Sequence, residues 1–329
     1  MHLKVGSWAK QGADELVNAD PTFPKDQYKP VLAKAQKVID LLKQANPQPT
    51  GIQPRAHRGM SGNSYTPNGA IPFSVTAMYF KYLCLPEIAA YYEPGQPVVP
   101  RDPTSGTVVA GGETGTSIYV NFNSLAWLVK EDLNLGKNLT VDGKLIFFSP
   151  KQIGDLRGLP LVRSDPRAGF RGEAVILTAG GVSPFKPASR EQFLAARVRF
   201  ARKQIEERQL EIQRSGNEKL NVFIKELETQ IASINAYKES LSPNERQVQA
   251  IIVDQGAGPE KLFVPASQDG AHRLVTIDRS LFDPALPRQS VQLIVVYWKW
   301  DEKDAVLSEL IRQFKQNFDF ETLKQMLGR

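Results

Sequence analysis

Residues 189–241 read SREQFLAARVRFARKQIEERQLEIQRSGNEKLNVFIKELETQIASINAYKESL, and this stretch carries the strongest structural pattern of the chain. Ser189 and Gln192 stand three residues apart, as the two partners of a helix-capping box do. Ser215 opens a Ser-Gly-Asn turn in the middle of the stretch. Beyond the turn, apolar residues recur at the alternating three- and four-residue steps of a coiled-coil seam, apart from one position taken by Lys238. They are Leu220, Ile224, Leu227, Ile231, Ile234 and Leu241. The stretch therefore predicts a long antiparallel helical hairpin in the second half of the chain.

Strand and helix patterns alternate irregularly outside this hairpin. Residues that are β-branched or aromatic favour strands in the segments 107–111, 116–122, 144–149, 249–255, 261–266, 273–278 and 291–300. Helical spacing of apolar residues favours helices at 20–47, 74–85, 124–135, 305–316 and 321–327. Because no regular β-α-β alternation connects these segments, the sequence predicts an α+β fold with mixed or antiparallel sheets and packed helices.

Segments rich in glycine and proline mark the expected turns and loops. GGETG at 111–115 and VDGK at 141–144 each separate two strand patterns, so both predict hairpin turns. The segment 47–73 is rich in Pro, Gly, Asn and Ser, and it predicts a long irregular loop. Loops of this length are uncommon in compact domains unless they carry function or are disordered. This loop is therefore a candidate site.

Three pairs of short segments suggest an internal duplication. Those that begin at residues 69, 119 and 144 resemble, in the same order, those that begin at residues 181, 274 and 292. An inserted helical hairpin would account for the greater length of the second copy. We therefore expect a first α+β unit at 20–155, a second at 156–300 that contains the hairpin, and C-terminal helices at 301–329.

The composition restricts the classes of protein that fit. The chain has 329 residues, 41 Lys and Arg against 35 Asp and Glu, and a single cysteine, Cys84, so it can form no intramolecular disulfide. No run of about 18 apolar residues occurs, which predicts that no segment spans a membrane. Charges of both signs are mixed and no basic tail is present, so we expect no nucleic-acid partner. The N-terminal residues show no leader pattern, which predicts either that no signal peptide is present or that a leader has been removed.

Familiar enzyme and metal motifs are absent from the sequence. His2 is terminal, and His57 and His272 have no His, Asp or Glu neighbour at metal-ligand spacing. The chain carries no Walker lysine motif, no nucleophile elbow and no dinucleotide-binding glycine motif. We therefore expect no metal and no cofactor, and no catalytic residue is assigned. Trp298 and Trp300 share one side of a strand, where burial is the favoured interpretation and stacking on a sugar or base the alternative.

Polar side chains gather in the loop 47–73. They are Arg55, His57, Arg58, Ser61, Asn63, Tyr65 and Asn68. Charge-assisted donors and a titratable imidazole in one segment predict the binding of an anionic or glycan ligand, with Arg55, His57, Arg58, Asn63 and Tyr65 as its contacts. Two alternatives stay open. The side chains tie the loop to its own backbone carbonyls, or Ser61 acts as a nucleophile with His57 as its base.

A second cluster of arginines follows the expected strands of the first half. It comprises Arg157, Arg163, Arg167, Arg171 and Arg190, with Glu173 nearby. Guanidinium groups bind carboxylates and phosphates in bidentate fashion, so Arg167 and Arg171 are candidate ligand-binding residues. The alternative is that these arginines pair with acidic residues across an interface between the halves of the chain.

Several segments resemble a group of exported bacterial proteins of unknown function. The resemblance is carried by ADPTFPKDQYKPVLAKA at 19–35, QPTGIQPRAHRG at 48–59 and LFDPALPRQSVQLIVVYWKW at 281–300. It implies a periplasmic or secreted location, with a cytoplasmic one still open, and it transfers no catalytic residue. We therefore expect a non-enzymatic envelope or secreted protein that binds a protein partner or an anionic or glycan ligand. The alternative is a hydrolase acting on a glycan, peptide or ester in a cleft beside the loop 55–68.

Overall fold

A computed structural model describes most of the chain. It covers residues 5–9, 28–60, 70–83, 109–125, 128–129, 135, 139–164, 170–254 and 256–328. The described residues fall into two compact units, each built from separate stretches of sequence. The first unit takes its residues from Met1–Asp132, Lys151–Val182 and Leu281–Arg329, and the second from Leu133–Pro150 and Ser183–Ser280.

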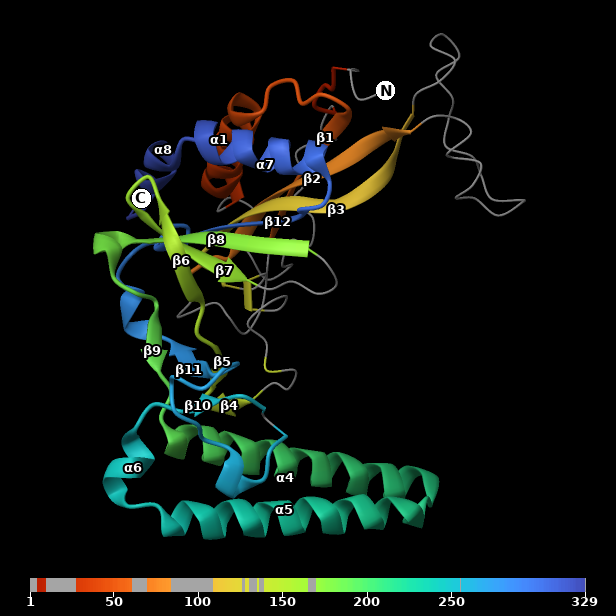
Figure 1. Cartoon of the computed structure of the whole chain (residues 1–329), viewed down its shortest axis with the longest axis vertical. Coiled ribbons are helices and arrows are strands. Elements are labelled where there is room, and N and C mark those ends of the chain that lie inside the picture. The colour runs from red at the N-terminus through yellow and green to blue at the C-terminus, as the bar shows by residue number, and fades with distance from the viewer. Residues whose placement is uncertain are drawn as a thin grey trace, which may run out of the picture. The chain divides into compact units, whose positions relative to one another are not determined.

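The first unit is built on a seven-stranded sheet in which all neighbouring strands are antiparallel (Figure 1). The strands, in spatial order, are β1 (Ile52–Met60), β2 (Phe73–Leu83), β3 (Val109–Phe122), β12 (Leu293–Asp301), β8 (Phe170–Thr178), β7 (Leu159–Ser164) and β6 (Lys151–Leu156). The C-terminal strand β12 therefore lies at the centre of the sheet, between β3 and β8. The short 3-10 helix η2 (Ala179–Gly181) follows β8.

Three helices cover one face of this sheet, as Figure 1 shows: α1 (Tyr28–Ala45), α7 (Ala305–Asn317) and α8 (Phe320–Lys324). Their apolar faces and the facing strand residues form one continuous core. Trp298 of β12 is fully buried there, with its ring 5.5 Å from that of Phe314 on α7 in an edge-on arrangement. The burial predicted for Trp298 and Trp300 is confirmed, since both are buried.

The second unit joins a smaller sheet to a pair of long helices. Its strands are β4 (Thr140–Val141), β5 (Lys144–Phe148), β9 (Phe185–Pro187), β10 (Ile251–Ile252) and β11 (His272–Ile277). Its helices are α4 (Arg190–Ser215), α5 (Asn221–Ser240) and α6 (Pro243–Gln247). Two 3-10 turns, η3 (Glu218–Leu220) and η4 (Pro259–Lys261), also belong to it. A third, η5 (Arg279–Leu281), lies where the chain passes from the second unit back to the first. Helices α4 and α5 lie side by side (Figure 1) and are joined at Gly216, whose left-handed backbone ends α4.

Several local predictions are confirmed. The amphipathic pattern at 20–47 forms α1 over its described part, and Ser189 caps α4 through a capping box with Gln192. The VDGK segment forms the turn between β4 and β5, with positive φ at Asp142 and Gly143. Together the helices and antiparallel sheets confirm the α+β class.

The structure corrects the predictions for residues 47–85. Residues 52–60, predicted as loop, form β1, and residues 73–83, predicted from residue 74 as a buried helix, form β2. Along both strands buried residues alternate with more exposed ones, as in β2, where Phe73, Val75, Ala77 and Tyr79 are buried and the residues between them from 76 on are less so. A period of two places every second side chain on one face of a sheet, which the short apolar run did not distinguish from helical spacing.

Two further predictions are wrong, one of a hairpin turn and one of a strand. The GGETG segment is no turn, because β3 continues through it. Gly115 has a φ of 70°, beside a shift in the pairing of β2 with β3, and a Cβ there would lie 2.6 Å from the Phe170 ring. Glycine at this position therefore permits both the irregular pairing of the strand and the close approach of the ring. The segment 261–266, predicted as a strand, forms the end of η4 and irregular backbone.

The proposed internal duplication is not confirmed. Residues 73–83 form strand β2, whereas the segment that was matched with them contains β9 and continues into helix α4. The two segments therefore differ in secondary structure. The predicted helix at 124–135 and Cys84 lie mostly or wholly outside the described residues.

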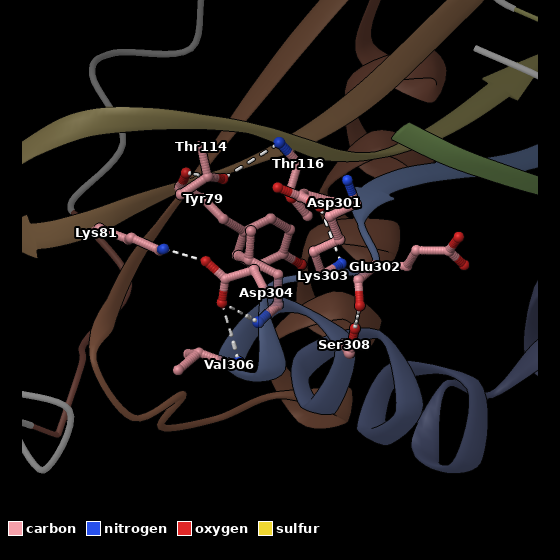
Figure 2. Close-up of polar contacts among 11 residues, drawn as sticks. Tyr79, Lys81, Thr114, Thr116, Asp301, Glu302, Lys303, Asp304, Val306 and Ser308 are labelled. Atoms are coloured by element: carbon pink, nitrogen blue, oxygen red, sulfur yellow. Dashed lines mark hydrogen bonds and ion pairs between the residues drawn. The ribbon is translucent and has the colours of Figure 1, made fainter. Parts of the chain in front are cut away.

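Asp304 links the first turn of α7 to strand β2 through an ion pair and two hydrogen bonds. Figure 2 shows its carboxylate between the Lys81 ammonium and the backbone of that turn, where it accepts from the N–H groups of Val306 and Leu307 at 3.0 and 3.2 Å. Burial favours the neutral carboxyl group, but the hydrogen bonds from Lys81, Leu307 and Val306 outweigh it and lower the pKa of Asp304. The charged carboxylate is thus the form that the fold stabilises.

Acid should therefore weaken this attachment. Because the pKa of Asp304 is depressed in the folded protein, its contribution is complete above the ordinary aspartate pKa of about 4 and is lost as the pH falls through the folded value. We expect the free energy of unfolding to fall more steeply between about pH 5 and pH 2 in the wild type than in Asp304→Asn, which keeps a capping oxygen but gains no proton. Urea unfolding across this range measures the difference, and parallel curves would contradict the assignment.

Candidate functional site

The first predicted cluster is divided between the two sides of strand β1. Arg58 lies on the same side as the core residues Ile52 and Ala56 and is buried, whereas Arg55 and His57 lie on the other side. Arg55 stacks over the Phe80 ring with its guanidinium carbon 4.2 Å from the ring centroid. Ser61, Asn63, Tyr65 and Asn68 lie outside the described residues. The structure therefore does not bring the described members of this cluster together on one surface.

The arginines of the second cluster also separate. Arg157 and Arg171 lie in the first unit and line a common groove, whereas Arg190 begins α4 in the second unit, 5.0 Å from the Phe263 ring centroid. Arg163 is exposed on β7, and Arg167 lies outside the described residues. Arg157 and Arg171 are thus the two members whose surroundings define a candidate site.

The groove beside Arg171, called the basic groove below, has a volume of about 710 Å³. Its lining residues come from the β6–β7 turn, β8, the end of β12 and one side of α7: Leu156, Arg157, Arg171, Trp300, Glu302, Ser308, Arg312, Lys315 and Gln316. A volume in this range suits a small organic ligand.

Arg171 is held in place by contacts on three sides. Its Nε donates to Glu173 Oε1 at 3.1 Å, its Nη2 lies 3.0 Å from the same oxygen, and its guanidinium carbon lies 5.7 Å from the Trp300 ring centroid. Nη1 has a longer contact of 3.4 Å to the exposed carboxylate of Glu302. The edge formed by Nε and Nη2 is therefore fixed by Glu173, whereas Nη1 contacts the solvent-exposed carboxylate of Glu302.

Glu173 is the buried anchor of the groove. Its side chain is only 1% exposed, and Lys315 Nζ of α7 lies 2.8 Å from Oε2 while Arg171 occupies Oε1. Glu173 stands opposite Trp298 in the pairing of β8 with β12, so it points to the helix-covered face of the sheet. A buried carboxylate requires such partners, because removing it from water is otherwise costly.

The turn between β6 and β7 places Arg157 against the C-terminal end of α7. Arg157 and Gly158 both have positive φ, as a two-residue hairpin turn of type I′ requires. The Arg157 guanidinium donates to the carbonyls of Phe318 and Lys315 at 3.0 and 2.9 Å. The Lys315 carbonyl lies in the last turn of α7, where carbonyls lack helical partners, so Arg157 stabilises this helix end while lining the groove.

On α7, Arg312 pairs with Glu309 through two hydrogen bonds of 2.6 Å and donates to Gln316. Hydrogen bonds from Arg312 and Gln313 lower the pKa of Glu309 to about 2. Four cations and three carboxylates thus lie in and beside the groove. The cations are Arg157, Arg171, Arg312 and Lys315, and the carboxylates are Glu173, Glu302 and Glu309. The balance of one positive charge favours an anionic ligand.

Sequence reasoning identified Arg171 as a candidate ligand residue and placed Arg157 in the same cluster, but it missed the residues of α7. Ser308, Arg312 and Lys315 stand at positions i, i+4 and i+7, so they form a polar stripe on one side of an amphipathic helix. That stripe is visible in the sequence, but such stripes usually face only solvent.

The described residues contain neither a metal-binding cluster nor a membrane-spanning helix. No three His, Cys, Asp or Glu side chains among them come together as a metal site would require. None of their helices has the length and apolar character needed to cross a bilayer. Comparison of the chain with protein-family models, with curated proteins and with solved structures gives no match.

Proposed function

We propose that this protein is a non-enzymatic binding protein whose basic groove takes an anionic ligand, such as a sugar acid or a phosphorylated compound. The observation that carries the proposal is the position of the Arg171 guanidinium. Buried Glu173 and Trp300 orient it, and its Nη1 points toward the exposed carboxylate of Glu302. A guanidinium held in this way loses little freedom on binding a second anion, so the groove is preorganised.

Glu302 indicates where the anion would bind. Its Oε2 lies 3.4 Å from Arg171 Nη1, near the outer limit of a hydrogen bond, and its side chain is 56% exposed. An exposed ion pair of this kind contributes little stability. A ligand carboxylate or phosphate can therefore displace Glu302 from Arg171 at small cost and take its position.

The remaining lining supports a ligand larger than a bare anion. Ser308 and Gln316 offer neutral hydrogen-bonding groups, and Leu156 and Trp300 offer apolar surface within the same groove. A few polar groups on a partly apolar wall are typical of small-molecule sites. This mixture favours a compound that carries one acidic group on a ring or chain.

An exported setting is part of the proposal and is supported by the sequence resemblance alone. A protein-binding role for the α4–α5 pair is supported by the exposed apolar side chains of Leu210, Val222 and Phe223, and it stays a prediction. The hydrolase alternative has less support, because His57 is exposed on β1 and its suggested nucleophile Ser61 lies outside the described residues.

Calorimetric titration with D-glucuronate, glucose 6-phosphate and neutral glucose tests the groove. We expect the two anions to bind and glucose not to, and Arg171→Met to weaken anion binding at least about tenfold, because one charge-assisted hydrogen bond is lost. Binding should also weaken as salt is raised, since the groove is open to solvent.

Arg55→Met is the matched comparison, because Arg55 is also an arginine stacked on an aromatic ring but lies on β1. It should leave anion binding unchanged. Binding that survives Arg171→Met and disappears in Arg55→Met would transfer the site to β1, and the absence of binding by both anions would oppose the proposal.

A further inference from the structure

A second feature lies in the other unit, on helix α4. Arg197 is buried, with 8% of its surface exposed, although its guanidinium has five N–H donors and is always charged. Its one hydrogen bond within the described part of the chain is a long one, from Nη1 to the Ala257 carbonyl at 3.5 Å. Burial lowers the pKa of Arg197, and the charge of Asp254 offsets this only in part. The cation is therefore poorly compensated by its described surroundings.

Arg197 borders a small cavity between α4 and α5. The cavity has a volume of about 40 Å³, and its walls include Ala201 and Gln204 of α4 and Leu227 and Gln230 of α5. Arg197, Ala201 and Gln204 stand at positions i, i+4 and i+7, so they share one side of α4. One cation, two amide groups and an apolar wall thus surround a single space.

The lining of the cavity is suited to an anion and not to a cation. None of its lining residues carries a carboxylate. No hydrogen bond engages the side-chain amides of Gln204 and Gln230 within the described residues, so their N–H groups can turn toward the space. A cation in this position would be repelled by Arg197.

The cavity is of a size that suits a small anion. One water needs about 10–15 Å³ of such space, so a volume of about 40 Å³ has room for a monatomic anion. A halide fits this space and carries a full negative charge. A water molecule would fit, but it would leave Asp254 as the only described charge that offsets the buried guanidinium, which is the more costly state.

We propose that this cavity binds one halide ion, chloride under physiological conditions, between the Arg197 guanidinium and the side-chain amides of Gln204 and Gln230. The ion neutralises the buried guanidinium and bridges α4 to α5 near their attachment to the rest of the second unit. The site is independent of the basic groove, which lies in the first unit.

Thermal unfolding of the full chain in sodium chloride, sodium bromide and sodium gluconate at equal ionic strength tests the site. Gluconate is too large for the cavity and serves as the reference anion. We expect the Tm to be a few degrees higher in chloride and bromide, because an ion that binds only the folded state stabilises it by mass action. Titration of the protein into chloride should also broaden the ³⁵Cl resonance, and bromide should reverse the broadening.

Arg197→Met is expected to abolish both the halide dependence of the Tm and the ³⁵Cl broadening. In gluconate it should be at least as stable as the wild type, because it removes a buried charge that Asp254 compensates only in part. Arg202→Met, which changes an exposed arginine on the same helix, should retain both effects. If Arg197→Met fails to fold, the double variant Gln204→Leu, Gln230→Leu should still reduce both.

Three results would overturn the halide site. They are equal Tm values in all three salts, ³⁵Cl broadening that is absent in the wild type, and broadening that persists in Arg197→Met. The first two indicate that the cavity holds water only, and the third indicates that chloride binds elsewhere on the surface.

Discussion

Asn123→Ala is expected to lower the free energy of unfolding by about 4 kcal/mol, and the Tm by roughly 10 °C. Asn123 is fully buried at the end of β3 and uses its whole side-chain amide. Nδ2 donates to the carbonyls of Ile71 and Ser290 at 3.0 and 2.9 Å, and Oδ1 accepts from the N–H groups of Gln292 and Leu293 at 2.8 and 3.3 Å. The alanine variant leaves these four backbone groups without their buried partner.

The backbone of Asn123 adds to this effect. Its φ is 54°, in the left-handed region that asparagine tolerates better than most residues and alanine tolerates poorly. The side chain also joins the starts of β2 and β12 to the end of β3, so its loss should affect cooperative unfolding of the whole first sheet. Urea unfolding followed by tryptophan fluorescence measures the change through buried Trp298.

Asn121 provides a matched control on the same strand. It is as deeply buried as Asn123, but its side-chain nitrogen and oxygen have no hydrogen-bond partner in the described part of the structure. Asn121→Ala should therefore cost far less than Asn123→Ala, because it removes a polar group without leaving described partners unsatisfied. Equal losses in the two variants would show that cavity formation, and not the hydrogen-bond network, dominates at this position.

Glu173→Leu is the second substitution with a large expected effect, a loss of about 3 kcal/mol. Removing the buried carboxylate leaves Arg171 and Lys315 facing each other without the anion that holds them. Both cations are partly exposed, so they can regain water, which limits the loss. The same variant should weaken anion binding in the basic groove, because Arg171 loses the contact that orients it.

Two further variants separate the charge of Glu173 from its volume. Glu173→Gln keeps the size and one hydrogen-bond acceptor, and it should be destabilised less than Glu173→Leu. The triple variant Glu173→Leu, Arg171→Met, Lys315→Met replaces the whole buried ion cluster by apolar groups, and it should regain much of the lost stability. If the triple variant is less stable than Glu173→Leu alone, the pairing of opposite charges is not what stabilises this cluster.

The predictions that held depend on neighbours along the chain. The apolar stripe of α1, the capping box at Ser189 and the turn at Asp142 and Gly143 all involve contacts within a few residues, so their sequence patterns contain the physical cause. The predictions that failed concern short apolar segments such as 73–83. There, the pairing of β2 with β1 and β3 selected the strand, and no local pattern specifies those partners.

The basic groove was predictable only in its residue types. Arg171 stood out with Arg167 as a candidate anion ligand from guanidinium chemistry, and Arg157 belonged to the same cluster of arginines. Their partners did not, because Glu302 is 131 residues from Arg171 in the sequence and Lys315 is 142 residues from Glu173. Insertion of β12 between β3 and β8 is what carries α7 to the face of the sheet on which Glu173 lies.

The sequence by itself thus determined the α+β class, the apolar stripe of α1, the two ends of α4 and the presence of arginines that the proposed anion site uses, because these depend on residue chemistry and short-range contacts. Only the tertiary structure decided that Arg55 and His57 are separated from Arg58 across β1, and that Arg171 meets Glu173, Trp300 and Lys315. Burial of the apolar faces of α1, α7 and the central strands drives that arrangement, and the polar residues are positioned as a consequence.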